Sequence, residues 1–134
     1  MARNAVTEDT EKITINLGYV DLGRIDLLVH EGFYSNRSDF IRAAIRAQLQ
    51  GHHEVIQQSA ARRTLVLGLQ DFSRADLEAV RARGERLQVH VLGLARIAQD
   101  VTAELALATI ESVRVLGGFQ APAAVRAALA ERIR

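Results

Sequence analysis

The chain has 134 residues, of which 49% are hydrophobic and 25% charged, with 17 basic and 16 acidic side chains. This composition is that of an ordinary folded protein and excludes an intrinsically disordered chain. No apolar run approaches the about 18 residues that a membrane-spanning helix needs, and no basic-then-apolar leader opens the sequence. The lack of Cys excludes disulfides, thiolate catalysis and Cys-based zinc sites. We therefore expect a cytoplasmic protein with no membrane partner.

The net charge is small in both halves of the chain. Residues 1–50 carry a net charge of −1, and residues 51–134 carry +2. Proteins that bind nucleic acid without sequence preference are usually strongly basic, and neither half has that balance. Any binding to DNA would therefore depend on a few well-placed side chains, and a dimer would bind with modest affinity.

The first predicted element is a strand over residues 12–17, which follows a polar, flexible arm at residues 1–10. The sequence KITINL alternates polar and apolar residues strictly, as a strand with one buried face does. The buried face would hold Ile13, Ile15 and Leu17. The opposite face would hold Lys12, Thr14 and Asn16.

Two helices are predicted after this strand. Apolar residues recur at helical spacing over residues 21–31, and Gly32 is a typical residue to follow a helix end. Asn36 can cap a second helix, with Asp39 three residues later approximating a capping box. This second helix carries a stripe of apolar residues and would end near Gly51. The stripe consists of Phe40, Ile41, Ala44, Ile45 and Leu49.

A lone strand with two short helices is incomplete. Buried backbone N–H and C=O groups without partners are rare, and one strand has no neighbour to pair with. Two short helices also cannot enclose a core by themselves. A second copy of the chain resolves both problems, because two strands then pair antiparallel and four helices close over their apolar face. Residues 11–50 therefore predict a homodimer.

Residues 11–50 resemble the ribbon-helix-helix family of DNA-binding proteins, of the Arc, MetJ and CopG type. The resemblance rests on the KITINL strand, the helix that follows it, and the stretch GFYSNRSDFIRAAI at residues 32–45. It implies an intertwined dimer whose two-stranded ribbon enters the major groove of double-stranded DNA. The expected dimer core comprises Ile13, Ile15, Leu17, Ile25, Phe40, Ile41 and Ile45.

The resemblance also implies which residues contact DNA. Lys12, Thr14 and Asn16 would contact the bases, and their chemistry suits this role. Lys donates to guanine, Asn pairs bidentately with adenine, and Thr offers a hydroxyl and a methyl group.

Phosphate contacts are expected at the start of the second helix and in the arm. A helix N-terminus points free N–H groups at an anion, and its dipole favours negative charge there. The expected phosphate-contacting residues are Asn36, Arg37, Ser38 and, from the arm, Arg3.

The second half of the chain contains an internal repeat. After a partly helical linker at residues 51–63, Val-Leu-Gly occurs at residues 66–68, 91–93 and 115–117. Each copy predicts a strand followed by a helix. The strands are expected at residues 64–67, 87–92 and 112–116, and the helix starts at Ser73, at Asp100 or Thr102, and at Pro122.

These units predict a small β/α-repeat domain over residues 64–134, with about three strand-helix units and parallel strands in a solenoid-like arrangement. The whole chain is thus expected to be α+β. A domain with only about three units buries its apolar faces poorly unless it packs against another chain or domain. We therefore expect this domain to pack against another copy, to build a higher oligomer, or to bind an effector or a protein partner.

Motifs of enzymes and metal sites are weak or missing. The sequence contains no GxGxxG, Walker or HExxH motif. His52, His53 and His90 raise the alternative of a metal sensor, but adjacent residues point apart on a strand or helix and rarely bind one ion. We expect no catalytic residues, no metal and no cofactor.

The leading hypothesis is a sequence-specific transcriptional regulator, most simply a repressor. The alternative is an antitoxin, whose N-terminal half binds DNA and whose C-terminal half binds a toxin. A third interpretation is an assembly protein, in which the repeats polymerise and the ribbon serves only to dimerise.

Overall fold

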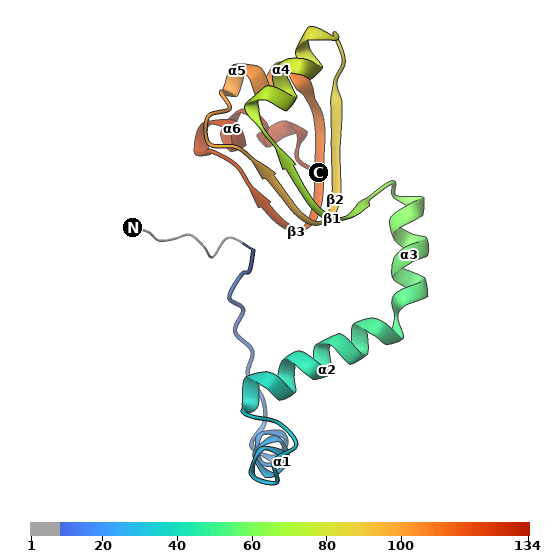
Figure 1. The fold of residues 1–134 in the computed structure, drawn as a ribbon, viewed down its shortest axis with the longest axis vertical. Coiled ribbons are helices and arrows are strands. Elements are labelled where there is room, and N and C mark those ends of the chain that lie inside the picture. Colours follow the sequence, from blue (N-terminus) through green and yellow to red (C-terminus); the bar gives the residue numbers. More distant parts are fainter. Residues whose placement is uncertain (1–8) are drawn as a thin grey trace. The chain divides into compact units, whose positions relative to one another are not determined.

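The computed structural model describes residues 9–134, so Arg3 and most of the expected arm lie outside the described residues (Figure 1). The protein is α+β, and it divides into two compact units. The first unit extends to Gln58, and the second spans Ser59–Arg134. Among the described residues, no helix is long and apolar enough to cross a membrane.

The first unit contains α1 (Tyr19–His30) and α2 (Arg37–Gly51). The two helices end and begin as their sequences predict. Gly32 follows α1 with a φ of +85°, and its N–H donates to the carbonyl oxygen of Val29 at 3.0 Å. The positive φ favours Gly, which has no Cβ to clash. At the start of α2, the side-chain oxygen of Asn36 accepts from the N–H of Asp39 at 2.8 Å.

The segment before α1 does not form the expected strand in the single chain. Residues 11–18 carry no assigned secondary structure. A strand is recognised by the hydrogen bonds it makes to a neighbouring strand, and within residues 9–134 the only sheet is formed by the second unit. After α2, the helix α3 (His53–Arg62) occupies most of the expected linker at residues 51–63.

The second unit alternates strands and helices around a parallel sheet (Figure 1). Its elements are β1 (Val66–Phe72), α4 (Arg74–Ala82), β2 (Leu87–Ile97), α5 (Ala103–Thr109), β3 (Ile110–Gln120), α6 (Ala123–Ala128) and a 3₁₀ turn at Ala130–Arg132. The sheet order is β1-β2-β3, and both pairings are parallel. Parallel strands in sequential order were expected from the sequence.

The sheet register places the three Val-Leu-Gly triplets side by side. Gly68 pairs with Gly93, and Gly93 pairs with Gly117. All three have positive φ values, between +124° and +141°. A Cβ at Gly93 would overlap the carbonyl oxygen of Gly68, and one at Gly117 would overlap that of Gly93. Glycine is therefore required at Gly93 and Gly117 both by the backbone conformation and by the close approach of the neighbouring strand.

The strands are longer than the sequence predicts. The expected strands at residues 64–67, 87–92 and 112–116 continue several residues beyond each glycine. In β1 the continuation includes Gln70 and Asp71, whose polar side chains indicate a loop when taken alone. Asp71 instead accepts a hydrogen bond from Arg96 of β2 at 2.8 Å. Thr64 lies before β1, with a φ of +54° at the end of α3.

Polar caps fix the helix starts of this unit. The Ser73 hydroxyl accepts from the N–H of Asp76, and the Asp76 carboxylate accepts from the N–H of Ser73, each at 3.0 Å. This capping box confirms the expected start of α4. The Thr102 hydroxyl accepts a hydrogen bond from the N–H of Leu105 at 3.1 Å, so Thr102, rather than Asp100, caps α5. Pro122 is the residue before α6 and not, as expected, part of its first turn.

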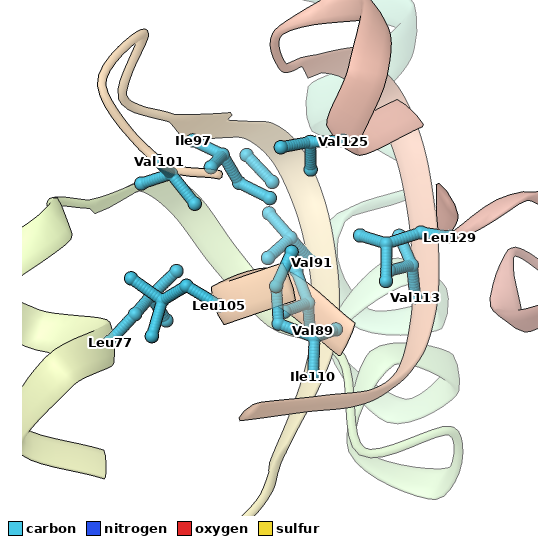
Figure 2. Packing of buried hydrophobic residues seen from close by; sticks show 12 residues of the cluster. Leu77, Val89, Val91, Ile97, Val101, Leu105, Ile110, Val113, Val125 and Leu129 are labelled. Atoms are coloured by element: carbon cyan, nitrogen blue, oxygen red, sulfur yellow. The ribbon is translucent and has the colours of Figure 1, made fainter. Parts of the chain in front are cut away.

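The core of the second unit lies between the sheet and the helices (Figure 2). Alternate residues of β2 and β3, including Val89, Val91 and Val113, are buried on one face of the sheet. Leu77 of α4 and Val125 of α6 point at this face in Figure 2. The remaining buried apolar residues of the cluster are Ala95, Ile97, Val101, Leu105, Ala106, Ile110 and Leu129.

The C-terminus of the chain lies along the outer edge of the sheet. Ile133 forms a parallel bridge with Val113 of β3, and the N–H of Arg134 donates to the carbonyl oxygen of Val113 at 2.7 Å. The guanidinium of Arg132 donates to the carbonyl oxygens of Leu107 and Ile110, both at 2.8 Å. These contacts tie the last residues to β3 and to the end of α5.

Candidate nucleic-acid interface

The apolar residues of the KITINL segment are exposed in the single chain. Ile13, Ile15 and Leu17 have exposed fractions of 72%, 59% and 37%. Leaving a large aliphatic side chain in water costs about 1.5–3 kcal/mol relative to burying it. This segment therefore leaves three large aliphatic side chains open to solvent in the single chain.

The two helices of the first unit expose a matching apolar surface. Within the described chain Ile25 is the one buried residue of α1, and α2 has none. Phe40, Ile41 and Ile45 of α2 thus remain at least partly open to solvent. A helix is stabilised mainly by packing of its apolar face. The single chain lacks that packing for α2.

These exposed residues surround one cleft of about 360 Å³ in the first unit. Six of the seven residues expected in the dimer core line it, and Ile13 does not. The apolar lining consists of Ile15, Leu17, Ile25, Leu28, Phe40, Ile41, Ala44 and Ile45. Asp21 and Arg24, which form an ion pair at 4.0 Å, complete it. The structure therefore brings the end of the KITINL segment, α1 and α2 around one apolar cleft.

The polar residues of the same segment are also exposed. Lys12, Thr14 and Asn16 alternate with the apolar residues along the chain, and all three are open to solvent. In an extended chain, alternate side chains point to opposite faces. If the helices of a dimer cover the apolar side chains, these three are left facing outward together.

The start of α2 carries the residues expected to contact phosphate. The Asn36 oxygen is occupied by the cap to Asp39, and Ser38 is exposed in the first turn. Arg37 is less free than the sequence predicts. Its guanidinium donates to both carboxylate oxygens of Asp26 on α1, from Nε at 2.8 Å and from Nη2 at 2.9 Å.

The contact between Arg37 and Asp26 also sets the ionisation of both groups. The hydrogen bonds from Arg37 lower the pKa of Asp26, and those to Asp26 raise the pKa of Arg37. Sequence analysis did not identify Asp26, because an acidic residue on the polar side of a helix has no distinctive pattern. The loop before α2 is fixed further by Tyr34 and Phe40, whose rings meet edge to face at 5.1 Å.

His52 and His90 each contact a neighbouring polar group. The ring of His52 contacts the carbonyl oxygen of Gln48 at 2.9 Å, and His90 of β2 contacts the Ser112 hydroxyl at 3.0 Å. In residues 9–134 no three His, Asp or Glu side chains gather in a group that could hold a metal ion.

Comparison with known proteins places the chain in a family. The model of a ribbon-helix-helix transcriptional regulator family matches residues 8–126. The match is wider than the resemblance at residues 11–50, and it includes nearly all of the second unit. No curated protein and no solved structure matches the chain. Because the match covers most of its length, the chain belongs to the ribbon-helix-helix family of transcriptional regulators.

Proposed function

We propose that the protein is a sequence-specific repressor that binds double-stranded DNA as a homodimer. In this dimer, residues 12–17 of two copies pair as an antiparallel ribbon, and the α2 helix of each copy closes over the cleft of the other. The ribbon enters the major groove, which is wide enough to admit two strands.

The observation that carries this proposal is the apolar cleft of the first unit. Its lining comes from three segments that are separate in the sequence, and these segments have little other burial in the described chain. Filling the cleft with Ile15, Phe40 and Ile45 of a second copy would bury the side chains that the single chain leaves open. The antiparallel pairing would also satisfy the backbone of residues 12–17.

The proposed contacts with DNA follow from the outward face of the ribbon. Lys12, Thr14 and Asn16 would contact base edges, because the apolar residues between them face the dimer core. The backbone N–H groups of Arg37 and Ser38 would bind a phosphate at the start of α2. Since Asp26 holds the Arg37 guanidinium, this phosphate contact relies on the backbone and the Ser38 hydroxyl.

The second unit favours a regulator over an antitoxin. Toxin-binding segments are often disordered until bound, whereas residues 66–134 form a sheet with its own buried core. We propose that this unit sets the oligomeric order or binds an effector. An antitoxin would instead form a stable stoichiometric complex with the product of a neighbouring gene when the two are co-expressed.

The dimer is tested by placing a charge in the cleft. Ile15→Lys should abolish the dimer and specific DNA binding together, because a buried unpaired charge is strongly unfavourable. Leu27→Lys is the matched control, since Leu27 is 61% exposed on α1 and does not line the cleft. Light scattering gives the mass, and fluorescence anisotropy gives the DNA affinity. A dimer that survives Ile15→Lys, or is lost equally in both variants, would contradict the proposal.

A further inference from the structure

The sheet of the second unit has an apolar face that the helices do not cover. Leu67, Leu92 and Leu116 align in one row across the three strands, and Leu69 and Leu94 align in the next row. These residues alternate along the strands with the residues of the buried cluster, so their side chains point to the opposite face of the sheet. Leu67, Leu69 and Leu116 have exposed fractions of 62%, 52% and 53%. We refer to these five residues as the leucine face.

Polar residues border the leucine face at both ends of the strands. On one side Asp71 and Arg96 are joined by a hydrogen bond of 2.8 Å. On the other side His90 pairs with Arg114 in the sheet and contacts the Ser112 hydroxyl. An apolar centre with a polar rim is the usual anatomy of a protein-protein interface. Of the two arginines at these borders, Arg96 is paired with the carboxylate of Asp71, which lowers the positive charge of the face.

The shape of the leucine face suits packing against another sheet. A Cβ at Gly118 would lie 3.1 Å from Cδ1 of Leu94, so the Leu94 side chain already covers the space above this glycine. The second row thus continues over Gly118 through the side chain of Leu94. Two such surfaces can stack face to face at about 10 Å, as the layers of a β-sandwich do.

The size of the leucine face decides which partner it fits. Strands about 4.8 Å apart that rise about 3.3 Å per residue give this three-stranded face roughly 300 Å². Stable interfaces bury about 800 Å² per partner. The face is therefore too small to hold a free partner tightly. It suffices for a partner that is already tethered, because tethering gives an effective concentration near the millimolar range.

We propose that the leucine face packs against the leucine face of the second copy in the same dimer. This inference rests on the proposed function, which supplies the tether through the paired first units. Both copies then bury the same residues, as an interface with two-fold symmetry requires. The contact joins the two second units into one body and couples them to the DNA-binding units.

The lack of Cys in the 134 residues allows a direct test by cross-linking of the whole chain. Leu92→Cys places one thiol at the centre of the leucine face, on the central strand. Arg81→Cys is the control, because Arg81 is exposed on α4, which packs on the opposite face of the sheet. A short bismaleimide should convert most of the Leu92→Cys protein to covalent dimer at low micromolar concentration, and at least ten-fold less of the Arg81→Cys protein.

Further substitutions added to the Leu92→Cys variant distinguish the contribution of the leucine face from that of the ribbon. Adding Leu67→Gln and Leu116→Gln should abolish cross-linking at position 92, whereas Leu107→Gln on α5 should leave it unchanged. Adding Ile15→Lys should also abolish it, because the tether is lost. Absence of cross-linking in a Leu92→Cys protein that remains dimeric and binds DNA would overturn this inference and leave the proposed function intact. Cross-linking that persists in the Ile15→Lys background would overturn the tethered contact.

Discussion

Arg37 and Asp26 form a bidentate ion pair that joins the start of α2 to α1, with nitrogen-oxygen distances of 2.8 and 2.9 Å. Both side chains are about half exposed, so solvent screens the pair and its contribution to stability is small. The pair instead fixes the position of the Arg37 guanidinium. It holds this group against Asp26 of α1, beside the start of α2, where we propose that a phosphate binds.

Removing Asp26 should therefore change DNA binding more than stability. Asp26→Asn would release the Arg37 guanidinium, which can then contact a phosphate. We expect tighter binding to a scrambled duplex. The dependence of the DNA affinity on salt concentration should also be steeper, by about one phosphate contact. Glu31→Gln is the control, because Glu31 is exposed directly after α1 and outside the cleft, and its loss changes the net charge equally while leaving the Arg37 pair intact. Anisotropy titrations over a range of salt concentrations give both quantities, and equal effects of the two variants would refute this role of Asp26.

The capping box of α4 should produce a stability that depends on pH. Hydrogen bonds from the backbone N–H and hydroxyl of Ser73 lower the pKa of Asp76 below its ordinary value of 3.8. The ionised carboxylate thus stabilises the folded state above pH 3.8, and this stability is lost as the pH falls through the lower pKa of the folded state. In urea unfolding, the free energy of unfolding should fall less steeply with decreasing pH below pH 4 in Asp76→Asn than in the wild type. Glu131→Gln, which removes an exposed carboxylate outside the box, should keep the wild-type slope, and identical slopes for wild type and Asp76→Asn would contradict this explanation.

The glycines that pair across the sheet, Gly68, Gly93 and Gly117, should respond unequally to substitution. Gly68→Ala meets open space, so its cost of about 1–3 kcal/mol comes from the positive φ alone. Gly93→Ala carries the same strain and also overlaps the Gly68 carbonyl, which adds about 1–3 kcal/mol. Denaturant unfolding of the second unit, followed by circular dichroism, measures both free energies. Equal destabilisation of the two variants would show that the close approach of the strands does not determine the requirement for glycine.

Base recognition by the ribbon can be tested at one residue. Asn16→Ala should lose about 1–3 kcal/mol of discrimination at one base pair, because a bidentate contact with adenine is removed. The fold and the affinity for random DNA should change little, since Asn16 is exposed in the described structure. Selection of binding sites from a random pool, with wild type and variant in parallel, gives the discrimination. Equal losses on specific and random DNA would remove Asn16 from the set of base readers.

Much of the local structure could be predicted because it depends on neighbouring residues. Gly32 ends α1, Asn36 begins α2, and Ser73 with Asp76 begins α4, all through contacts within a few residues of the chain. The spacing of the Val-Leu-Gly triplets likewise predicted strand-helix units with parallel strands, and the structure shows the three glycines in register. The interpretation of these units as a solenoid-like repeat stays a prediction.

The features that sequence missed depend on contacts between distant residues. The extension of β1 through Asp71 relies on Arg96, which lies on another strand. The pairing of Asp26 with Arg37 relies on how α1 and α2 approach each other. The expected strand at residues 12–17 is absent from the single chain because its proposed partner belongs to a second copy. The pairings of Asp71 with Arg96 and of Asp26 with Arg37 leave no periodic pattern in the sequence, whereas the alternation over residues 12–17 does.

The most direct test of the account is a DNA titration. The full-length protein would be titrated against the DNA upstream of its own gene and against a scrambled duplex of equal length, at two salt concentrations. We predict specific binding by the wild type that the combined substitution of Lys12, Thr14 and Asn16 by Ala abolishes, while the variant remains a dimer. A variant that still distinguishes the two duplexes, or a wild type that binds neither, would contradict recognition of DNA by the ribbon.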